Sequence, residues 1–335
     1  MNSNSHNFRP PKKICFMHRA STGDSLLATP VYRAAKECFP DCQTVLVTSP
    51  VSAELLKGIP YIDKLVSYRN GDSVLPVIKS MWRADAAIIL DYHYRNAFFA
   101  FLALIGKRIG RGKNFLTEII KDDSADTFEP LKYLKIARSL GIETDDLRLY
   151  RPTGTPDEKL RVQKIYREVK GDMSRLAVIV PYSLSGVKDW SAQKYREIIK
   201  RLAAKGCATA IVGGAENRER AAKDFPMSVN LAGRTNLRES AEFVAMCDLQ
   251  ICGCTSMLHI ATAVGTPAVA IYGPTAPQQW APKENCAVIT KNFPCSPCYN
   301  TANECKQGGE SRCLKAISIE DVWAATENVL RSLPS

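Results

Sequence analysis

The chain has 335 residues, 45% of them apolar and 24% charged, and a formal net charge of +11. This length suits two globular domains rather than one. No apolar run approaches the roughly 20 residues that a membrane-spanning helix requires. Residues 1–13 are polar and lack the apolar centre of a signal peptide, so we expect a cytosolic protein.

Basic residues outnumber acidic residues by 45 to 34. They are scattered along the chain, and no nucleic-acid-binding motif accompanies them, which argues against nucleic acid as a partner. An anionic membrane face or a phosphorylated acceptor would attract such a chain. A solvated basic surface without any such partner explains the charge equally well.

Short apolar strands alternate with amphipathic helices along almost the whole chain. Strands are predicted at residues 14–18, 44–48, 64–68, 86–90, 108–110, 176–181, 208–213, 229–231, 249–252, 268–272 and 287–290. Helical patterns include residues 28–38, 129–140, 191–205 and 237–247. Such alternation is typical of parallel sheets covered by helices on both faces. We therefore predict an α/β protein with two doubly wound, Rossmann-like domains that face each other across a cleft.

The alternation pauses at residues 151–156, a Pro-, Gly- and Thr-rich stretch that is typical of a linker. The domains are accordingly predicted as residues 1–153 and residues 154–335. A final helix is predicted at residues 318–333, and it could pack back on the first domain.

Two polar segments follow strands in the first half. The first strand leads into Gly23 and Asp24, before a helix. Asp24 suits an N-cap, but a carboxylate at that place can also act as a general base. The fourth strand is followed by His93 and Arg95. Arg95 could bind an acceptor phosphate or carboxylate, and His93 could line a sugar site, although an ordinary polar loop explains both residues equally well.

In the second half, the loop after residues 176–181 contains Lys188, whose charge can neutralise a diphosphate leaving group. A solvated lysine is the plain alternative. The next strand ends at Gly213 and Gly214, which let the backbone approach a nucleotide closely. Glu216 follows with a carboxylate suited to ribose hydroxyls, and Glu219 is an alternative one helical turn further along.

The most informative stretch is residues 252–280. A strand ends at a polar turn containing Thr255 and Ser256, and a helix with His259 in its first turn begins at once. The unpaired N–H groups and the positive end of such a helix make a phosphate site. Thr255 and Ser256 add hydroxyl donors, and His259 adds a ring nitrogen. The segment therefore predicts a diphosphate-bearing ligand.

Three blocks, residues 19–30, 182–190 and 252–274, resemble the motifs of glycosyltransferase family 9, the lipopolysaccharide heptosyltransferases. Gly23-Asp24, followed by apolar residues, Thr and Pro, is similar to the N-terminal family motif, in which the Asp is the proposed general base. Lys-x-Trp at residues 188–190 is similar to a second motif. Thr255, His259, Gly-Thr-Pro at 265–267 and Gly-Pro at 273–274 fit the donor motif. The resemblance runs from about residue 14 to about residue 333.

The resemblance implies the two-domain B-type glycosyltransferase fold and an inverting transfer of a heptose or related sugar. The implied donor is a nucleotide diphosphate sugar, ADP-heptose by analogy, and the acceptor is a lipopolysaccharide core or another lipid-linked oligosaccharide. The enzyme would be cytoplasmic and peripheral on the anionic inner face of the cytoplasmic membrane. No cofactor and no metal is expected, because Lys188, Thr255 and the helix N-terminus can supply the positive charge that the leaving diphosphate needs.

The resemblance also assigns residues to roles. Asp24 and Lys188 are the expected catalytic residues, and His93 and Arg95 the expected acceptor-binding residues. The expected donor-binding residues are Lys188, Gly214, Glu216, Thr255, Ser256 and His259. The family pattern is broken at two places, because Cys254 replaces the family Asp and Ser256 the family Gly. Two alternatives therefore stay open: a nucleotide-sugar epimerase or hydrolase of similar fold, and a non-catalytic protein that binds a nucleotide or glycan.

Twelve cysteines in a chain expected to be cytosolic argue for thiols or metal rather than disulfides. Four of them occupy one polar loop in a C-x2-C-x6-C-x7-C pattern: Cys295, Cys298, Cys305 and Cys313. Four thiolates could bind a structural Zn²⁺, but the pattern lacks the paired C-x2-C knuckles of a strong zinc site. We expect reduced thiols, with zinc as the alternative.

Overall fold

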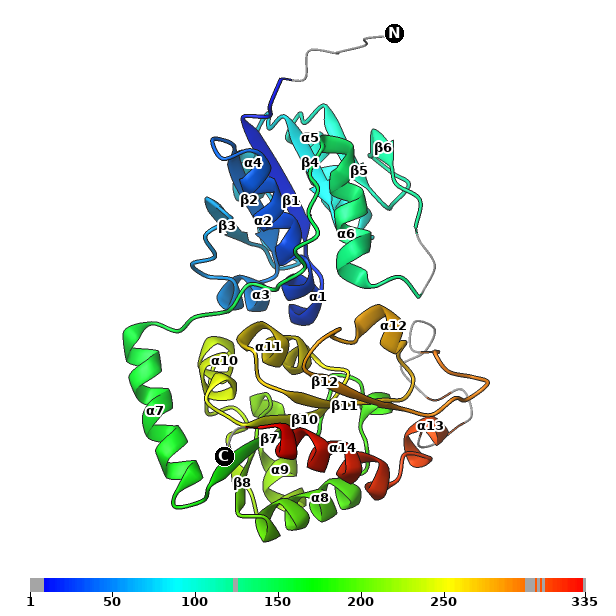
Figure 1. The fold of residues 1–335 in the computed structure, drawn as a ribbon. Helices are drawn as coiled ribbons and strands as arrows, with labels where there is room; N and C mark the ends of the chain where they lie inside the picture. Colours follow the sequence, from blue (N-terminus) through cyan, green and yellow to red (C-terminus); the bar gives the residue numbers. More distant parts are fainter. Residues whose placement is uncertain (1–8, 123–125, 299–304, 306–307, 309–310, 334–335) are drawn as a thin grey trace. The chain divides into compact units, whose positions relative to one another are not determined.

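The computed structural model describes residues 9–122, 126–298, 305, 308 and 311–333. The chain divides into two compact units (Figure 1). The first holds Met1–Ser124 and Glu129–Tyr150, and the second holds Arg151–Ser335 together with the short segment Ala125–Phe128. Each unit is built around its own six-stranded sheet.

The first domain contains a fully parallel sheet in the order β3-β2-β1-β4-β5-β6. Its strands are β1 (Lys13–His18), β2 (Gln43–Thr48), β3 (Lys64–Ser67), β4 (Ala86–Ile89), β5 (Lys107–Gly110) and β6 (Glu118–Ile119). In the central register, Cys15 of β1 pairs with Val45 on one side and Ala87 on the other. This strand order is that of dinucleotide-binding domains, in which the winding reverses between the first and fourth strands.

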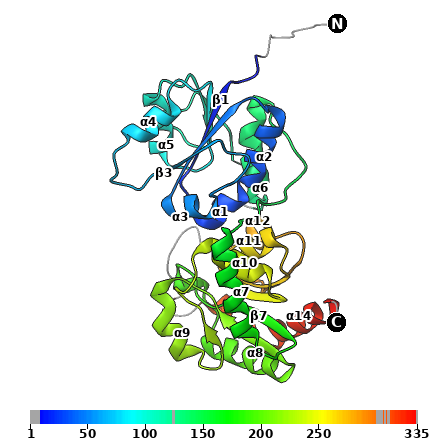
Figure 2. The same ribbon diagram turned by 90° about the vertical axis from the view of Figure 1, so that its left-hand side faces the viewer.

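Helices cover both faces of this sheet. They are α1 (Thr22–Leu27), α2 (Thr29–Cys38), α3 (Pro50–Leu55), α4 (Leu75–Met81), α5 (Tyr94–Leu102) and α6 (Glu129–Ala137), which the 3₁₀ turn η1 (Arg138–Leu140) extends. Figure 2 shows α4 and α5 on one side of the sheet and α2 and α6 on the other. Met81 and Phe99 pack from α4 and α5 onto Cys15 and Met17 of β1. Both faces of β1 are therefore buried, which explains its continuous apolar run.

The second domain repeats the design in the order β12-β11-β10-β7-β8-β9, again fully parallel. Its strands are β7 (Arg175–Val180), β8 (Cys207–Ile211), β9 (Val229–Asn230), β10 (Leu249–Gly253), β11 (Ala268–Tyr272) and β12 (Cys286–Thr290). Counted from β7, this is the same order as in the first domain. The sheet that the sequence predicts for each half is confirmed, and every predicted strand is found with shifts of one or two residues at its ends.

The helical elements of this domain are α7 (Pro156–Lys170), η2 (Gly186–Lys188), α8 (Ala192–Ala204), η3 (Ala215–Asn217), α9 (Arg218–Asp224), α10 (Leu237–Ala245), α11 (Ser256–Val264), α12 (Pro277–Trp280), α13 (Arg312–Lys315) and α14 (Ile319–Ser332). α8 and α14 share a core in which Ile198 and Val322 meet Ile179 of β7. α10 packs against both α7 and α11. The final helix, α14, packs on α8, β11 and β12 of its own domain.

Local sequence fixes where several of these helices begin. Reciprocal capping boxes, in which the N-cap side chain and the side chain three residues later each satisfy a backbone N–H, start α1, α7, α10 and α14. Local sequence also fixes where α11 ends. It stops at Gly265, whose φ of +86° suits glycine. The loops at the carboxyl edge of each sheet are thus anchored by well-defined helix starts.

Candidate functional site

The candidate residues of the first domain follow β1 and β4, where the winding of the sheet reverses. Asp24 is the third residue of α1, and its carboxylate accepts from the Ser21 backbone N–H at 3.3 Å. The N-cap is Ser21, whose hydroxyl accepts from the Asp24 N–H at 3.3 Å. The interpretation of Asp24 as the N-cap, and of Gly23 as part of a turn before the helix, is therefore wrong, because α1 begins earlier, at Thr22.

Asp24 is half-buried, and its charge acts on Tyr133 of α6. Burial raises the pKa of Tyr133 well above its usual value, and Asp24 raises this pKa further. A carboxylate that is held by a helix start and still partly reached by solvent suits a base that must meet a substrate hydroxyl.

Asp91, at the end of β4, organises the second polar segment. Its carboxylate accepts from the Arg19 backbone N–H at 2.7 Å, the His93 N–H at 3.0 Å and the Asn96 side-chain amide at 2.7 Å. Asn96 in turn accepts from the Arg19 guanidinium at 2.7 Å. Arg19 also lies 5.0 Å from the centre of the Tyr68 ring. These contacts hold the Arg19 guanidinium in place beside the loop that carries His93.

His93 and Arg95 are exposed at the start of α5. Burial lowers the pKa of Arg19, Asp91 opposes this shift, and the nearby charge of Arg95 lowers this pKa further. Arg19 and Arg95 are thus two guanidinium groups close enough to repel each other. Such a pair favours an anion between or beside its members.

A buried polar cluster supports this edge from the α6 side. Arg111 donates to the Leu90 carbonyl at 2.9 Å and to Glu129 at 3.0 Å. His18 is only 1% exposed, and burial lowers its pKa to about 4. Its Nε2 atom has no hydrogen-bond partner among residues 9–122 and the other described segments. His18 is therefore a neutral ring with a free nitrogen at the end of β1.

In the second domain, Lys188 and His259 are brought together, although they lie 71 positions apart in the printed sequence. Lys188 ends η2, the turn after β7, and His259 lies in the first turn of α11 after β10. Burial lowers the pKa of His259 to about 4, and the positive charge of Lys188 contributes to the shift. The backbone of this loop also lies against β10, since a Cβ on Gly253 would meet the Lys188 carbonyl at 3.2 Å. A neutral imidazole beside an ammonium group suits an anionic ligand.

Three hydroxyl groups at adjacent strand ends lack partners. The side-chain oxygens of Ser185, Thr255 and Thr275 are buried and have no hydrogen-bond partner within the described part of the chain. Ser185 follows β7, Thr255 follows β10, and Thr275 follows β11, and these strands are neighbours in the order β11-β10-β7. Thr255 is the N-cap residue of α11 but makes no side-chain capping bond. A buried hydroxyl without a hydrogen-bond partner costs free energy of folding. A ligand with several acceptor oxygens at this edge would supply the missing partners.

The turn after β8 places Glu216 over Gly214. A Cβ on Gly214 would lie 2.2 Å from both Glu216 carboxylate oxygens, so this carboxylate lies directly over the Gly214 backbone. Gly233, with φ of +66°, lies so close that its own Cβ would be 2.6 Å from the Ala215 Cα. The Gly233 N–H donates to the Gly213 carbonyl at 2.9 Å. The two glycine turns thus form one packed unit that presents the exposed Glu216.

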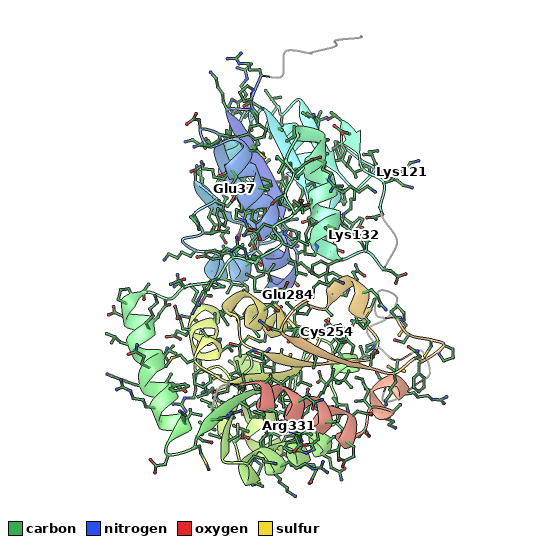
Figure 3. All side chains as sticks on the ribbon, in the orientation of Figure 1. Glu37, Lys121, Lys132, Cys254, Glu284 and Arg331 are labelled. Carbon is green, nitrogen blue, oxygen red and sulfur yellow. The ribbon has the colours of Figure 1, made fainter. Side chains whose placement is uncertain are left out.

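Cys254 lies at the junction of β10 and α11 (Figure 3). Its thiol is beside the buried Tyr272 hydroxyl, and burial together with this neighbour raises the pKa of Tyr272 well above its usual value. Ser256 is the first residue of α11, at the positive end of the helix dipole.

Comparison with known proteins decides the family. The model of glycosyltransferase family 9 (heptosyltransferase) matches residues 76–307, more than half of the chain. This chain belongs to glycosyltransferase family 9. It is a glycosyltransferase, and its two Rossmann-like domains are those of the B-type fold.

Relatives of this family 9 transferase are distant in sequence but similar in length and fold. Lipooligosaccharide heptosyltransferase 2 of Haemophilus influenzae is 25% identical over 301 residues, covering 80% of this chain and 85% of that protein. The crystal structure of a family 9 glycosyltransferase from Veillonella parvula has a TM-score of 0.82 at 20% identity, covering 96% of this chain and 98% of that chain. The structure of E. coli ADP-heptose lps heptosyltransferase II has a TM-score of 0.78 at 20% identity, covering 95% of this chain and 98% of that chain.

Sequence reasoning overlooked several polar residues of this transferase. Arg19, Asn96 and Arg111 in the first domain, and Ser185 and Thr275 in the second, were not singled out. Their signal was position, because Arg19 directly follows β1 and Thr275 directly follows the Gly-Pro turn after β11. Polar and charged residues directly after parallel strands lie at the carboxyl edge of the sheet, where ligands bind in such folds.

The cysteine loop of the transferase lies next to the turn after β11. The Cys298 N–H donates to the Pro274 carbonyl at 2.9 Å, and a Cβ on Gly273 would lie 3.2 Å from the Cys313 sulfur. Burial is the main cause that raises the pKa of the Cys313 thiol, and the neighbouring thiols of Cys298 and Cys295 raise it further. Among the residues whose placement is described, no group of three or more His, Cys, Asp or Glu side chains is arranged to hold a metal ion. The described residues likewise include no helix long and apolar enough to span a membrane.

Proposed function

We propose that this glycosyltransferase moves a heptose from ADP-heptose to a sugar hydroxyl of a lipopolysaccharide core or related lipid-linked acceptor. The observation that carries the proposal is the carboxyl edge of the second sheet. There, Lys188 and His259 lie close together, and three partnerless hydroxyls follow adjacent strands. A diphosphate offers negative charge that attracts the Lys188 ammonium, and it offers acceptor oxygens to the three partnerless hydroxyls. The relatives' names, lipooligosaccharide heptosyltransferase and ADP-heptose heptosyltransferase, support heptose as the sugar.

In the proposed reaction, Asp24 takes the proton from the acceptor hydroxyl. The hydroxyl oxygen attacks the anomeric carbon as the bond to the diphosphate breaks, which inverts the configuration there. Negative charge develops on the departing diphosphate, and Lys188, Thr255 and the N-terminus of α11 stabilise it. Glu216 would accept hydrogen bonds from the ribose hydroxyls, with Gly214 keeping its carboxylate close to the backbone.

The acceptor is assigned to the first domain. His93, Arg95 and the positioned Arg19 would bind a phosphate or carboxylate of the acceptor core. A lipid-linked acceptor stays in its bilayer, so the enzyme would work as a peripheral protein at the anionic inner face of the cytoplasmic membrane.

The test is product analysis with purified protein, ADP-heptose and a lipopolysaccharide acceptor that lacks the added heptose. We expect release of ADP only when the acceptor is present, together with an acceptor product larger by one heptose. A changed nucleotide sugar, or free heptose, without acceptor would instead identify an epimerase or hydrolase. Tight ADP-heptose binding without turnover on any lipid acceptor would identify a non-catalytic binder.

A further inference from the structure

An apolar stripe in the first domain runs along α5 and includes residues of the turns that follow α5 and β5. We define it as Tyr94, Phe98, Phe101, Leu102, Leu104 and Phe115. Phe98 is half-buried, and the exposed fraction of the others lies between 37% and 61%. On α5, Tyr94, Phe98 and Phe101–Leu102 recur at helical spacing and so share one face. The Phe115 ring extends this face, with centroids 4.9 Å from Phe98 and 5.6 Å from Phe101.

Two residues of the stripe, Leu104 and Phe115, have a strained backbone conformation. Leu104 has φ of +56° and Phe115 has φ of +64°, a conformation that side chains other than Gly, Asn and Asp rarely adopt. Asn or Gly would relieve the strain at both positions. Leu104, which is 61% exposed, gains little burial in return for its strain, and such strain is typical of functional surfaces.

The neighbouring turn adds to the same surface. The Arg83 N–H donates to the Ala103 carbonyl at 2.9 Å, which joins the turn after α4 to the turn after α5. Trp82 in that turn is 49% exposed. Figure 2 shows α4 and α5 together on one face of the sheet. The two turns therefore meet through their backbones, and each carries an exposed apolar side chain, Trp82 and Leu104.

The charge around the stripe is mostly positive. Residues 94–117 contain no Asp or Glu, and four of their cationic residues lie outside the buried polar cluster: Arg95, Lys107, Arg108 and Lys113. The fifth, Arg111, is buried in ion pairs with Glu129 and Asp122. The Arg108 guanidinium lies 5.6 Å from the Phe101 ring centre and donates to the Phe115 carbonyl. Lys121, after β6, is also exposed (Figure 3). The acidic neighbours include Glu118, 3.8 Å from Lys107, and Asp122, 3.4 Å from Arg111.

We infer that this stripe docks the enzyme on an anionic lipid bilayer. Aromatic and aliphatic side chains insert at the level of the lipid headgroups, while the surrounding cations bind anionic headgroups. A second copy of the chain fits the surface poorly, because a symmetric contact would bring the same cations against each other. The stripe begins at Tyr94, between His93 and Arg95, so it leads from the bilayer to the residues proposed to bind the acceptor.

The inference deepens the proposed function, since a lipid-linked acceptor is reached only at a membrane. It is tested without any transfer assay, by floating the full chain with vesicles of phosphatidylcholine alone or mixed with phosphatidylglycerol. We expect binding to the mixed vesicles only, weakening as salt concentration rises. Equal binding to neutral vesicles, or no binding to either, would overturn the inference.

The decisive variants are Leu104→Asn and Phe115→Asn. Asn tolerates the left-handed backbone, so Leu104→Asn should remain at least as stable to heat as the parent. Phe115→Asn should stay folded, because relief of strain offsets part of the lost contacts with Phe98 and Phe101. The double variant should reduce partitioning onto anionic vesicles by about tenfold. Met227→Asn, which removes a 63% exposed side chain of the second domain, is the matched control and should bind like the parent.

Two further results separate the competing explanations. If the double variant binds vesicles like the parent but abolishes a concentration-dependent dimer, the stripe is an interface between copies and the inference is wrong. If anionic vesicles bind as expected while the parent transfers heptose to no acceptor, the docking surface stands and the proposed function fails. With both correct, the double variant should lose transfer to acceptor in vesicles but keep transfer to a water-soluble acceptor fragment.

Discussion

Asp24 makes two interactions at the level of a single residue. Its carboxylate completes the capping box of α1 by accepting from the Ser21 N–H, and its charge acts on the buried Tyr133. The helix start fixes where the carboxylate lies, and the partial exposure leaves it accessible to a substrate. Capping and catalysis are therefore not exclusive interpretations of this residue, and mutations can separate them.

Asp24→Asn should abolish most transfer while leaving ADP-heptose affinity nearly unchanged, because the amide keeps the size and the hydrogen-bond acceptor but cannot take a proton. Loss of a general base costs a factor of about 10² to 10⁴ in rate. The control is Ser21→Ala, which removes the cap hydroxyl at a cost of about 1 kcal/mol in stability and should keep the rate per folded molecule. Transfer at the parental rate by Asp24→Asn would leave Asp24 with its capping role only.

Lys188→Ala should weaken ADP binding and slow transfer together, because the charge would meet the diphosphate before and during bond cleavage. The expected loss is about 1.5–3 kcal/mol in binding free energy, measured by calorimetry. The pKa of His259 should also rise, since Lys188 lowers it, and NMR titration would report this. Lys200→Ala, an exposed lysine of α8, is the control. Unchanged ADP affinity in Lys188→Ala would rule out the proposed role.

Cys254→Asp tests the position where this chain departs from the family motif. Diphosphate recognition should survive, because Thr255 and the N–H groups of α11 are untouched. ADP affinity should stay within about threefold, which is less than ~0.7 kcal/mol. Transfer from ADP-heptose should rise, because a carboxylate can accept from a sugar hydroxyl and from the neighbouring Tyr272 hydroxyl. A collapse of transfer with the native donor would show instead that Cys254 is adapted to another sugar.

At the scale of elements, the second domain depends on close contact between two glycine turns. Gly233 has φ of +66° and approaches the Ala215 backbone so closely that no Cβ fits. This contact joins the turn after β9 to the turn after β8, which carries Glu216. The ribose side of the proposed donor site is therefore formed by two turns jointly.

Gly233→Ala should destabilise the second domain by about 1–3 kcal/mol through backbone strain and the clash and should weaken ADP binding as the Glu216 turn shifts. Thermal melting and calorimetry would measure the two effects. Gly171→Ala is a matched control, since Gly171 also has positive φ, +50°, but nothing lies within 4 Å of its Cβ position. It should lose stability without losing ADP affinity. Equal ADP affinity in both variants would show that the two turns act independently.

At the scale of the whole molecule, each domain contains one buried histidine at its carboxyl edge. Burial lowers the pKa of both His18 and His259 to about 4, against about 6.5 in the unfolded chain. Between about pH 4 and pH 6.5, each histidine is mostly protonated in the unfolded chain and mostly neutral in the folded chain. Each histidine therefore stabilises the fold fully above about pH 6.5, and this contribution falls as pH drops toward 4.

The free energy of unfolding should accordingly fall between pH 6.5 and pH 4.5 by about 1.4 kcal/mol per pH unit for each histidine. Denaturant titration of the apo protein at several pH values would measure the slope. His18→Gln should remove the part of the slope that belongs to the first domain. A slope unchanged by His18→Gln would mean that this ring titrates alike in the folded and unfolded chain.

The sequence by itself determined the alternation of strands and helices, and hence two parallel sheets, because buried strands and amphipathic helices leave local periodic patterns. It also indicated Asp24, Lys188 and His259, since each lies in a polar segment directly after an apolar strand. Tertiary structure decided the order of the strands, and with it which polar segments become neighbours. Ser185, Thr255 and Thr275 are distant along the chain, and only the order β11-β10-β7 places their hydroxyls at adjacent strand ends. Likewise, Arg19 meets Asp91 and Asn96 because β1 pairs with β4. Strand order depends on long-range packing of whole helices against the sheet, and no local pattern encodes it.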